Sequence, residues 1–197
     1  MEVLQKKQVD GIVFVASGDQ TQLLDQLLQQ DFPVVLMVDR DMAAVPADAV
    51  LADTFQGGYQ ATRHLIDLGH KRIGCISAPE NISKRSARVE GYKQALAEAQ
   101  LSFDPSIFCY GNYHPDSGYK VTQELLNSPA PPSALFIYND LMAIGVLRAA
   151  TDLKVRVPEE LAIVSFDNIE LAAYTTPQLT TLAQPTVQMG ETAVSLL

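Results

Sequence analysis

The sequence lacks tryptophan and contains only two cysteines among its 197 residues. Its longest apolar runs, residues 12–16 and 33–38, are far shorter than the ~18 residues needed to cross a bilayer, so we predict no membrane span. The first residues also lack the apolar core of a signal peptide. We therefore expect a cytoplasmic protein.

Positive charge is scarce as well, because 14 lysines and arginines stand against 23 aspartates and glutamates, giving a net charge of −9. No segment forms a basic stripe of the kind that binds phosphate backbones. These 197 residues are therefore not expected to contact nucleic acid.

Motifs that would indicate an enzyme are missing too. There is no GxSxG, no GxxxxGK[ST] and no GxGxxG after a strand. Gly57 and Gly58 lie in an expected helix and indicate a packing contact. Cys75 and Cys109 form no CxxC and are typical of buried free thiols, and the histidines have no metal-ligand spacing. We expect no catalysis, no metal and no cofactor.

Short apolar runs alternate with amphipathic helical segments along the chain. The apolar runs are continuous, which is typical of strands buried on both faces of a parallel sheet. This pattern predicts an α/β fold with right-handed crossovers. The expected strands are 11–16, 34–39, 49–52, 72–77, 107–110, 134–138, 161–166 and 179–182, and the expected helices are 19–30, 55–68, 84–100, 116–127, 140–153 and 186–197.

Only three of these strands precede Asp53, whereas five follow it. A doubly wound lobe with three strands is short of core. We therefore expect the first lobe to be truncated, lacking part of its N-terminal side.

Polar side chains stand at the points where several expected strands end. In open parallel sheets, ligands bind beyond the carboxyl ends of the strands. Mixed carboxylates, amides and guanidinium groups suit a polyol, because each hydroxyl both donates and accepts hydrogen bonds. The strand-end residues are Asp39-Arg40, Asn139-Asp140, Asp167-Asn168 and Gln184.

Each of these residues also has a simpler interpretation. Asp140, or Asn139 before it, would cap the following helix. Asp167 and Asn168 would form a turn. Arg88 would be a solvated charge on a helix surface.

Several motifs run along most of the chain in a fixed order and spacing. With them the sequence resembles the lactose repressor/galactose repressor (LacI/GalR) family, and its Thr-Pro-x-Leu-Thr-Thr stretch looks like the cytoplasmic repressors rather than their periplasmic relatives. The motifs are Gly69-His70-Lys71-Arg72-Ile73-Gly74, Arg88-x-x-Gly91-Tyr92, Asn139-Asp140-x-Met142-Ala143-x-Gly145, Val157-Pro158-x-x-Leu161, Phe166-Asp167-Asn168, Thr176-Pro177-x-Leu179-Thr180-Thr181-x-x-Gln184-Pro185 and Gly190-Glu191-Thr192-Ala193.

This resemblance implies a fold of two Rossmann-like, doubly wound lobes, similar to periplasmic ribose-binding proteins. It places the first lobe at 1–53 with 183–197 and the second at 54–182. It also implies a ligand site in the cleft between the lobes, where an aromatic ring packs against the apolar face of a sugar. The ligand-binding residues implied by their motifs are Asp39, Arg40, Arg88, Tyr113, Asn139, Asp167 and Gln184.

The implied function is the effector-binding and dimerisation core of a sugar-responsive repressor, in which a pentose or hexose controls operator binding allosterically. The alternative is a solute-binding protein of a sugar transporter. Family members begin with a helix-turn-helix and a hinge helix that this sequence does not contain, so operator DNA would be bound only through that head. A homodimer is implied through segments 115–119 and 169–174, where Leu171 and Tyr174 would otherwise be exposed.

Overall fold

The structure is a computed structural model that describes residues 9–15, 27–28, 32–38, 47–84 and 86–197. The chain divides into two compact units, Met1–Ala52 with Pro185–Leu197, and Asp53–Gln184. The boundaries expected from the sequence differ from these limits by one or two residues. Within the described ranges, no helix is long and apolar enough to cross a membrane.

Strands and helices alternate in the second unit, and every strand pair among the described residues of both units is parallel, which confirms the α/β fold class. Every expected strand is present, with each end shifted by at most one residue. The strands are β1 (Ile12–Val15), β2 (Val34–Val38), β3 (Asp48–Leu51), β4 (Ile73–Ser77), β5 (Phe108–Tyr110), β6 (Ala134–Ile137), β7 (Ala162–Asp167) and β8 (Thr180–Ala183).

The first unit contains a sheet in the order β1-β2-β3. Helix α8 (Thr186–Leu196) covers one face, where Met189 and Ala193 pack with Val35 and Val50. On the other face, Leu36 packs with Leu27. The helix expected at 19–30 falls mostly outside the described residues.

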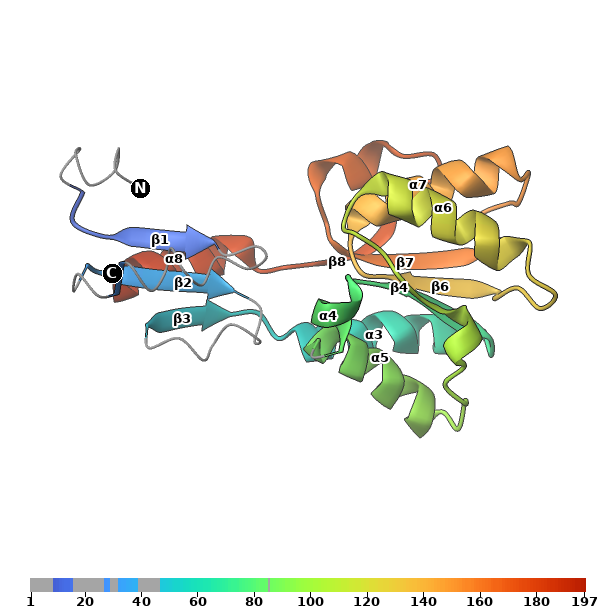
Figure 1. Ribbon diagram of the computed structural model, residues 1–197, viewed down its shortest axis with the longest axis horizontal. Coiled ribbons are helices and arrows are strands. Elements are labelled where there is room, and N and C mark those ends of the chain that lie inside the picture. The colour runs from blue at the N-terminus through green and yellow to red at the C-terminus, as the bar shows by residue number, and fades with distance from the viewer. Residues whose placement is uncertain (1–8, 16–26, 29–31, 39–46, 85) are drawn as a thin grey trace. The chain divides into compact units, whose positions relative to one another are not determined.

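The second unit contains a sheet in the order β5-β4-β6-β7-β8. Helices α3 (Thr54–Asp67) and α5 (Ala87–Glu98) cover one face, and α6 (Pro115–Leu126) and α7 (Asp140–Asp152) cover the other (Figure 1).

The sequence of strand β6 is apolar throughout because both faces of the strand are buried. Ala134 and Phe136 pack towards α3 and α5, whereas Leu135 and Ile137 pack towards α6 and α7. Successive side chains of a strand point to opposite faces, and here both faces are core.

Helices α3 and α5 touch through their backbones. A Cβ atom on Gly58 would lie 2.0 Å from the carbonyl oxygen of Arg88, and one on Gly91 would lie 2.1 Å from that of Phe55. A Cβ on Gly57 would meet the ring of Phe166 at 2.1 Å. The packing interpretation of the two adjacent glycines is therefore confirmed, and this close crossing holds Arg88 near the sheet.

The helix expected over 84–100 is shorter than predicted. A short helix α4 (Glu80–Ser83) precedes α5, and Ser86 is the extended N-cap residue of α5. Two 3₁₀ turns that the sequence analysis did not predict, η2 (Pro105–Ile107) and η3 (Glu170–Tyr174), follow α5 and β7.

An ion pair joins the start of β4 to the loop before η2. Arg72 donates through Nη1 to the Asp104 carboxylate at 2.5 Å and through Nε to the Ala130 carbonyl at 3.0 Å. The hydroxyl and backbone N–H of Ser106 also donate to Asp104, at 2.6 and 2.9 Å. The Ser106 hydrogen bonds, followed by Arg72, lower the pKa of the Asp104 carboxyl from 3.8 to about 2.

We predict that Asp104→Asn lowers the free energy of unfolding near neutral pH, because a carboxylate with a lowered pKa stabilises the folded state when it is charged. This contribution is present above pH 3.8 and is lost as the pH falls towards about 2. Denaturant titrations should therefore show the two proteins converging over that range. Asp67→Asn, which breaks an exposed i,i+4 pair with Arg63, is the matched control and should change stability little. If the difference in free energy of unfolding between Asp104→Asn and the original protein did not change with pH, the lowered pKa of Asp104 would not be its cause.

Candidate functional site

Five of the predicted ligand residues lie at one edge of the second unit's sheet. Tyr113 follows β5, Asn139 follows β6, Asp167 ends β7, Gln184 follows β8, and Arg88 lies in the first turn of α5. Because the strands are parallel, their carboxyl ends share this edge. Hydrogen bonds and ring contacts among these residues and their neighbours form a strand-end cluster.

The Arg88 side chain is buried, with 3% of the residue exposed. Its guanidinium carbon lies 3.8 Å from the ring centre of Phe166 and 4.2 Å from that of Tyr138. Nη1 donates to the Tyr138 carbonyl at 2.5 Å. The two rings therefore hold the cation through its faces. The simpler interpretation of Arg88 as a solvated helix charge is wrong.

The guanidinium of Arg88 is not saturated by the protein. Its Nε is buried and has no hydrogen-bond partner, and among the described residues no carboxylate forms an ion pair with it. A buried cation without a counter-charge is costly to keep in a fold. Such a group is suited to donate hydrogen bonds to a ligand.

Asp167 and Gln184 form a second polar group at this edge. The Gln184 side-chain amide donates to the Asp167 carboxylate at 2.7 Å. The backbone of Asp167 has φ = 112°, and the next residue, Asn168, has φ = 54°. Such values are uncommon for residues other than glycine, and strained backbone is found at ligand sites more often than elsewhere.

Like Asp167, Tyr113 has a positive φ, and like Arg88 it contacts the ring of Tyr138. Its φ is 71°, and its ring lies 5.9 Å from the Tyr138 ring in an edge-on orientation of 65°. Its carbonyl accepts a hydrogen bond from the Asn139 side chain at 3.1 Å. The loop after β5 is thereby tied to the loop after β6.

Asn139, and not Asp140, caps helix α7. The Asn139 side-chain oxygen accepts from the N–H of Met142 at 3.0 Å. The prediction that one of these two residues caps the helix is confirmed for Asn139, whereas Asp140 is not the cap, because its carboxylate is turned to β7 and β8. With one N–H given to Tyr113, Asn139 retains one N–H and one lone pair for a ligand.

The two aromatic residues that hold Arg88 are not among the predicted ligand residues. Tyr138 and Phe166 each stand directly before a polar pair, in Tyr138-Asn139-Asp140 and Phe166-Asp167-Asn168. This repeated pattern of an aromatic residue followed by Asn and Asp was the available signal. The other two predicted ligand residues, Asp39 and Arg40, lie outside the described residues.

The two cysteines are free thiols. Burial raises the pKa of the Cys75 thiol, as expected for a buried free cysteine, and also that of Cys109, which is only half-buried. Among the described residues, no three His, Cys, Asp or Glu side chains cluster as metal ligands.

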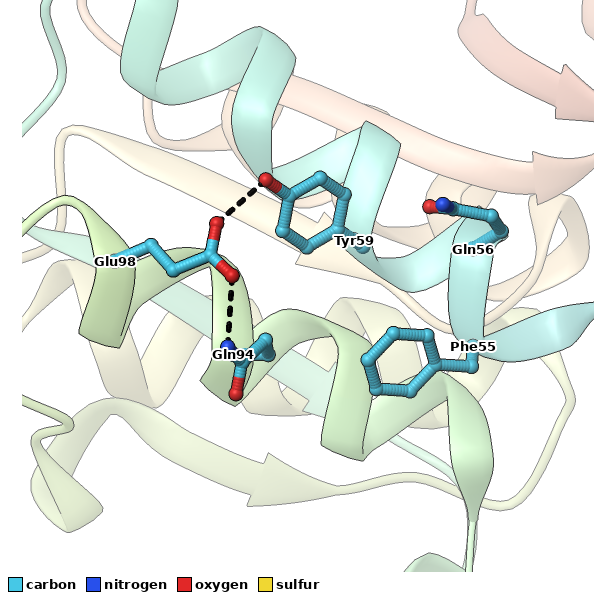
Figure 2. Close-up of a pocket in the computed structure, with 5 residues that line it drawn as sticks. All are labelled: Phe55, Gln56, Tyr59, Gln94 and Glu98. Atoms are coloured by element: carbon cyan, nitrogen blue, oxygen red, sulfur yellow. Dashed lines mark hydrogen bonds between the residues drawn. The ribbon is translucent and has the colours of Figure 1, made fainter.

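A pocket of about 380 Å³ lies between α3 and α5, and none of the predicted ligand residues lines it. Figure 2 shows that Tyr59 and Gln94 both turn towards Glu98, to whose carboxylate each donates at 2.7 Å. These hydrogen bonds, that of Tyr59 first, lower the pKa of the Glu98 carboxyl. Because Tyr59, Gln94 and Glu98 are already paired with one another, we assign no ligand to this pocket. Its remaining lining residues are Phe55 and Gln56.

The parallel α/β units and the strand-end cluster define a periplasmic-binding-protein-like domain, and the sequence profile of that family matches residues 62–197. A LacI-family regulator from Enterococcus faecium, crystallised with bound ribose, is 32% identical and has a TM-score of 0.81, over 98% of this chain and 72% of its own. The regulator CcpA of Lactococcus lactis is 34% identical, with a TM-score of 0.87, over 99% and 71%.

The transcriptional repressor PurR of Escherichia coli is 36% identical over all of this chain, which spans 58% of that repressor's length. The chain therefore belongs to the LacI family of transcription regulators, as the motifs predicted. These relatives are named as regulators of transcription and not as enzymes.

We predict that replacing Arg88 does not destabilise the protein. Arg88→Met keeps a long side chain between the two rings and removes an unpaired buried cation, so the free energy of unfolding should rise or stay within about 1 kcal/mol. Thermal or urea unfolding measures this. Arg72→Met is the control, and it should lower stability because it leaves Asp104 without its ion pair. A loss of several kcal/mol for Arg88→Met would show that the arginine is structural.

Proposed function

We propose that this chain is the effector-binding and dimerisation core of a cytoplasmic, sugar-responsive repressor of the LacI/GalR type, and not an enzyme. The observation that carries the proposal is the buried guanidinium of Arg88, whose Nε has no hydrogen-bond partner and which packs on the ring of Phe166, the residue before Asp167. The alternative of a transporter's solute-binding protein has no specific support, because PurR, CcpA and the E. faecium protein are all regulators.

The chemistry of the cluster suits a pentose or hexose. Arg88 offers donors, the Asp167 carboxylate offers acceptors, and the Gln184 amide offers both. Tyr113 adds an aromatic ring that can pack on the C–H face of a sugar. The bound ribose in the E. faecium regulator supports this class of effector. The proposed ligand set also keeps Asp39, Arg40 and Asn139.

In the proposed mechanism, effector and operator are coupled through two conformations of the intact regulator. The effector shifts the equilibrium only by as much as it binds one conformation better than the other. Operator DNA would be bound by a head segment, because residues 1–197 carry net negative charge and no basic stripe. The effector thereby controls operator affinity.

The experiment that tests the effector class is a thermal-shift screen of the intact protein with D-ribose, hexoses and nucleosides. A ligand present at about 100 times its Kd stabilises the protein by about 2.7 kcal/mol. Stabilisation by a sugar supports the proposal. Stabilisation by a nucleoside and by no sugar would show that the effector is not a sugar. If no compound stabilised the protein, the proposal of a pentose or hexose effector would be refuted.

We predict that Asp167→Ala in the intact protein abolishes the response to the sugar and leaves operator binding unchanged. Removing the carboxylate leaves the sugar hydroxyls without acceptors, and a buried unpaired polar group costs about 1–3 kcal/mol, or roughly a ten- to hundredfold loss of affinity. Operator release against sugar concentration measures this, and the melting temperature is recorded in parallel. Normal induction with a lowered melting temperature would show that Asp167 only forms a turn.

We also propose a two-fold homodimer that uses the 3₁₀ turn η3 and the start of α6. In η3, Leu171 and Tyr174 are 55% and 75% exposed, which leaves apolar surface that a partner would cover. Tyr174→Asp should convert the intact protein from dimer to monomer in sedimentation experiments at tens of micromolar. Tyr110→Asp, at an exposed aromatic residue of β5, is the control and should leave the dimer intact. An intact protein that is monomeric before mutation would refute this proposal.

A further inference from the structure

The carboxylate of Asp140 is completely buried, with 0% of the residue exposed. It accepts three hydrogen bonds: from the Ser165 hydroxyl, from the Thr181 hydroxyl at 2.6 Å, and from the backbone N–H of Ile169 at 2.8 Å. No described lysine or arginine pairs with it. Neutral donors from three parts of the chain therefore satisfy a buried charge.

Two of these donors connect Asp140 to the residues that follow Asp167. Ile169 donates to Asp140 directly, and Asn168 donates its N–H to the hydroxyl of Thr181 at 3.2 Å, which in turn donates to Asp140. The backbone N–H of Ile169 is thus bound to the carboxylate directly, and that of Asn168 is linked to it through the Thr181 hydroxyl. Ser165, in β7, is held by the same group from the other side.

This arrangement explains how Asp167 keeps an unfavourable backbone. Its φ of 112° and the φ of 54° at Asn168 cost energy that other contacts must offset. Hydrogen bonds to a carboxylate are stronger than neutral ones. One such bond, from the N–H of Ile169, holds the turn directly, and the bond from Thr181 to the same carboxylate fixes the hydroxyl that accepts from Asn168. The turn fixes the direction in which the Asp167 carboxylate leaves the sheet, next to Gln184.

We propose that Asp140 is a positioning residue for the effector site: it does not touch the effector but holds the Asp167–Ile169 turn in the conformation that binds it. This inference rests on the proposed function of Asp167. Asp140 cannot itself contact the effector, because it has no exposed surface and both its oxygens are occupied. Thr181 is the link through which it acts on Asn168.

A matched pair of variants separates positioning from general stability. Thr181→Val keeps the shape of the side chain but removes the link between Asp140 and Asn168. Ser165→Ala removes another hydrogen bond to the same carboxylate and leaves the turn untouched. Calorimetric titration of the intact protein with D-ribose should show affinity roughly 3- to 10-fold lower for Thr181→Val and changed less than about 2-fold for Ser165→Ala. Equal losses for the two variants would overturn the inference.

The conservative variant at Asp140 provides a rescue. Asp140→Asn can turn its oxygen to Ile169 and its NH₂ to the two hydroxyls, which can accept, so the turn is kept without the charge. D-ribose affinity should then stay within about 3-fold of the original, whereas Asp140→Ala should lose it as Asp167→Ala does. Equal losses for Asp140→Asn and Asp140→Ala would show that the charge itself acts on the ligand, and would overturn the inference.

A double-mutant cycle tests whether Thr181 acts through Asp167. The loss caused by Thr181→Val should largely vanish in the Asp167→Ala background, because residues that act as a unit are not additive. To keep residual binding measurable in both arms, the cycle uses D-ribose at millimolar concentrations. Additive losses would overturn the inference.

A ligand-free measurement keeps the inference testable if D-ribose does not bind at all, an outcome that counts against the proposed function alone. Amide hydrogen exchange at Asn168 and Ile169 should be slow in the original protein. Thr181→Val should speed exchange at Asn168, Asp140→Ala should speed it at both, and Ser165→Ala at neither. Unchanged exchange at Asn168 and Ile169 in Asp140→Ala would overturn the inference, whatever the sugar result.

Discussion

A parallel sheet has to be covered by helices on both faces, because its strands can be joined only by crossovers that carry a helix back to the starting edge. In the second unit this constraint leaves β6 and most of β7 buried, and their inner side chains are apolar except for Ser165, whose hydroxyl donates to Asp140. The charged and amide side chains then lie at the ends of the strands. The cluster at the carboxyl edge depends on this constraint, because the same edge receives the residues after β5, β6, β7 and β8.

Within that edge, the order of the strands decides which residues meet. Strands β6 and β7 are neighbours, so Tyr138 and Phe166 stand side by side and leave a gap between ring faces that Arg88 fills. Strands β7 and β8 are also neighbours, which brings Gln184 to Asp167. Asp140 lies beneath this row and joins the start of α7 to both strands.

The sequence allowed the strands to be predicted well, because a strand buried on both faces leaves a local signature in a few consecutive residues. The polar residues at the strand ends were predictable because they directly follow these apolar runs. The side chains that each of them would contact could not be predicted. Whether Asn139 or Asp140 caps α7 depends on the hydroxyls of Ser165 and Thr181, which lie far along the chain. Likewise, the burial of Arg88 depends on rings from two other strands and on the glycine contact with α3, none of which local periodicity records.

The clamp on Arg88 also bears on the entropy of recognition. A free arginine side chain carries about 2 kcal/mol of rotamer entropy, which a flexible surface arginine loses each time it closes on a ligand. Here the rings of Tyr138 and Phe166 and the carbonyl of Tyr138 have already restricted the side chain when the protein folds. The side chain is therefore ordered when the protein folds. An effector bound at the proposed site would meet an arginine with little freedom left to lose, so more of the energy of each new hydrogen bond would remain as affinity.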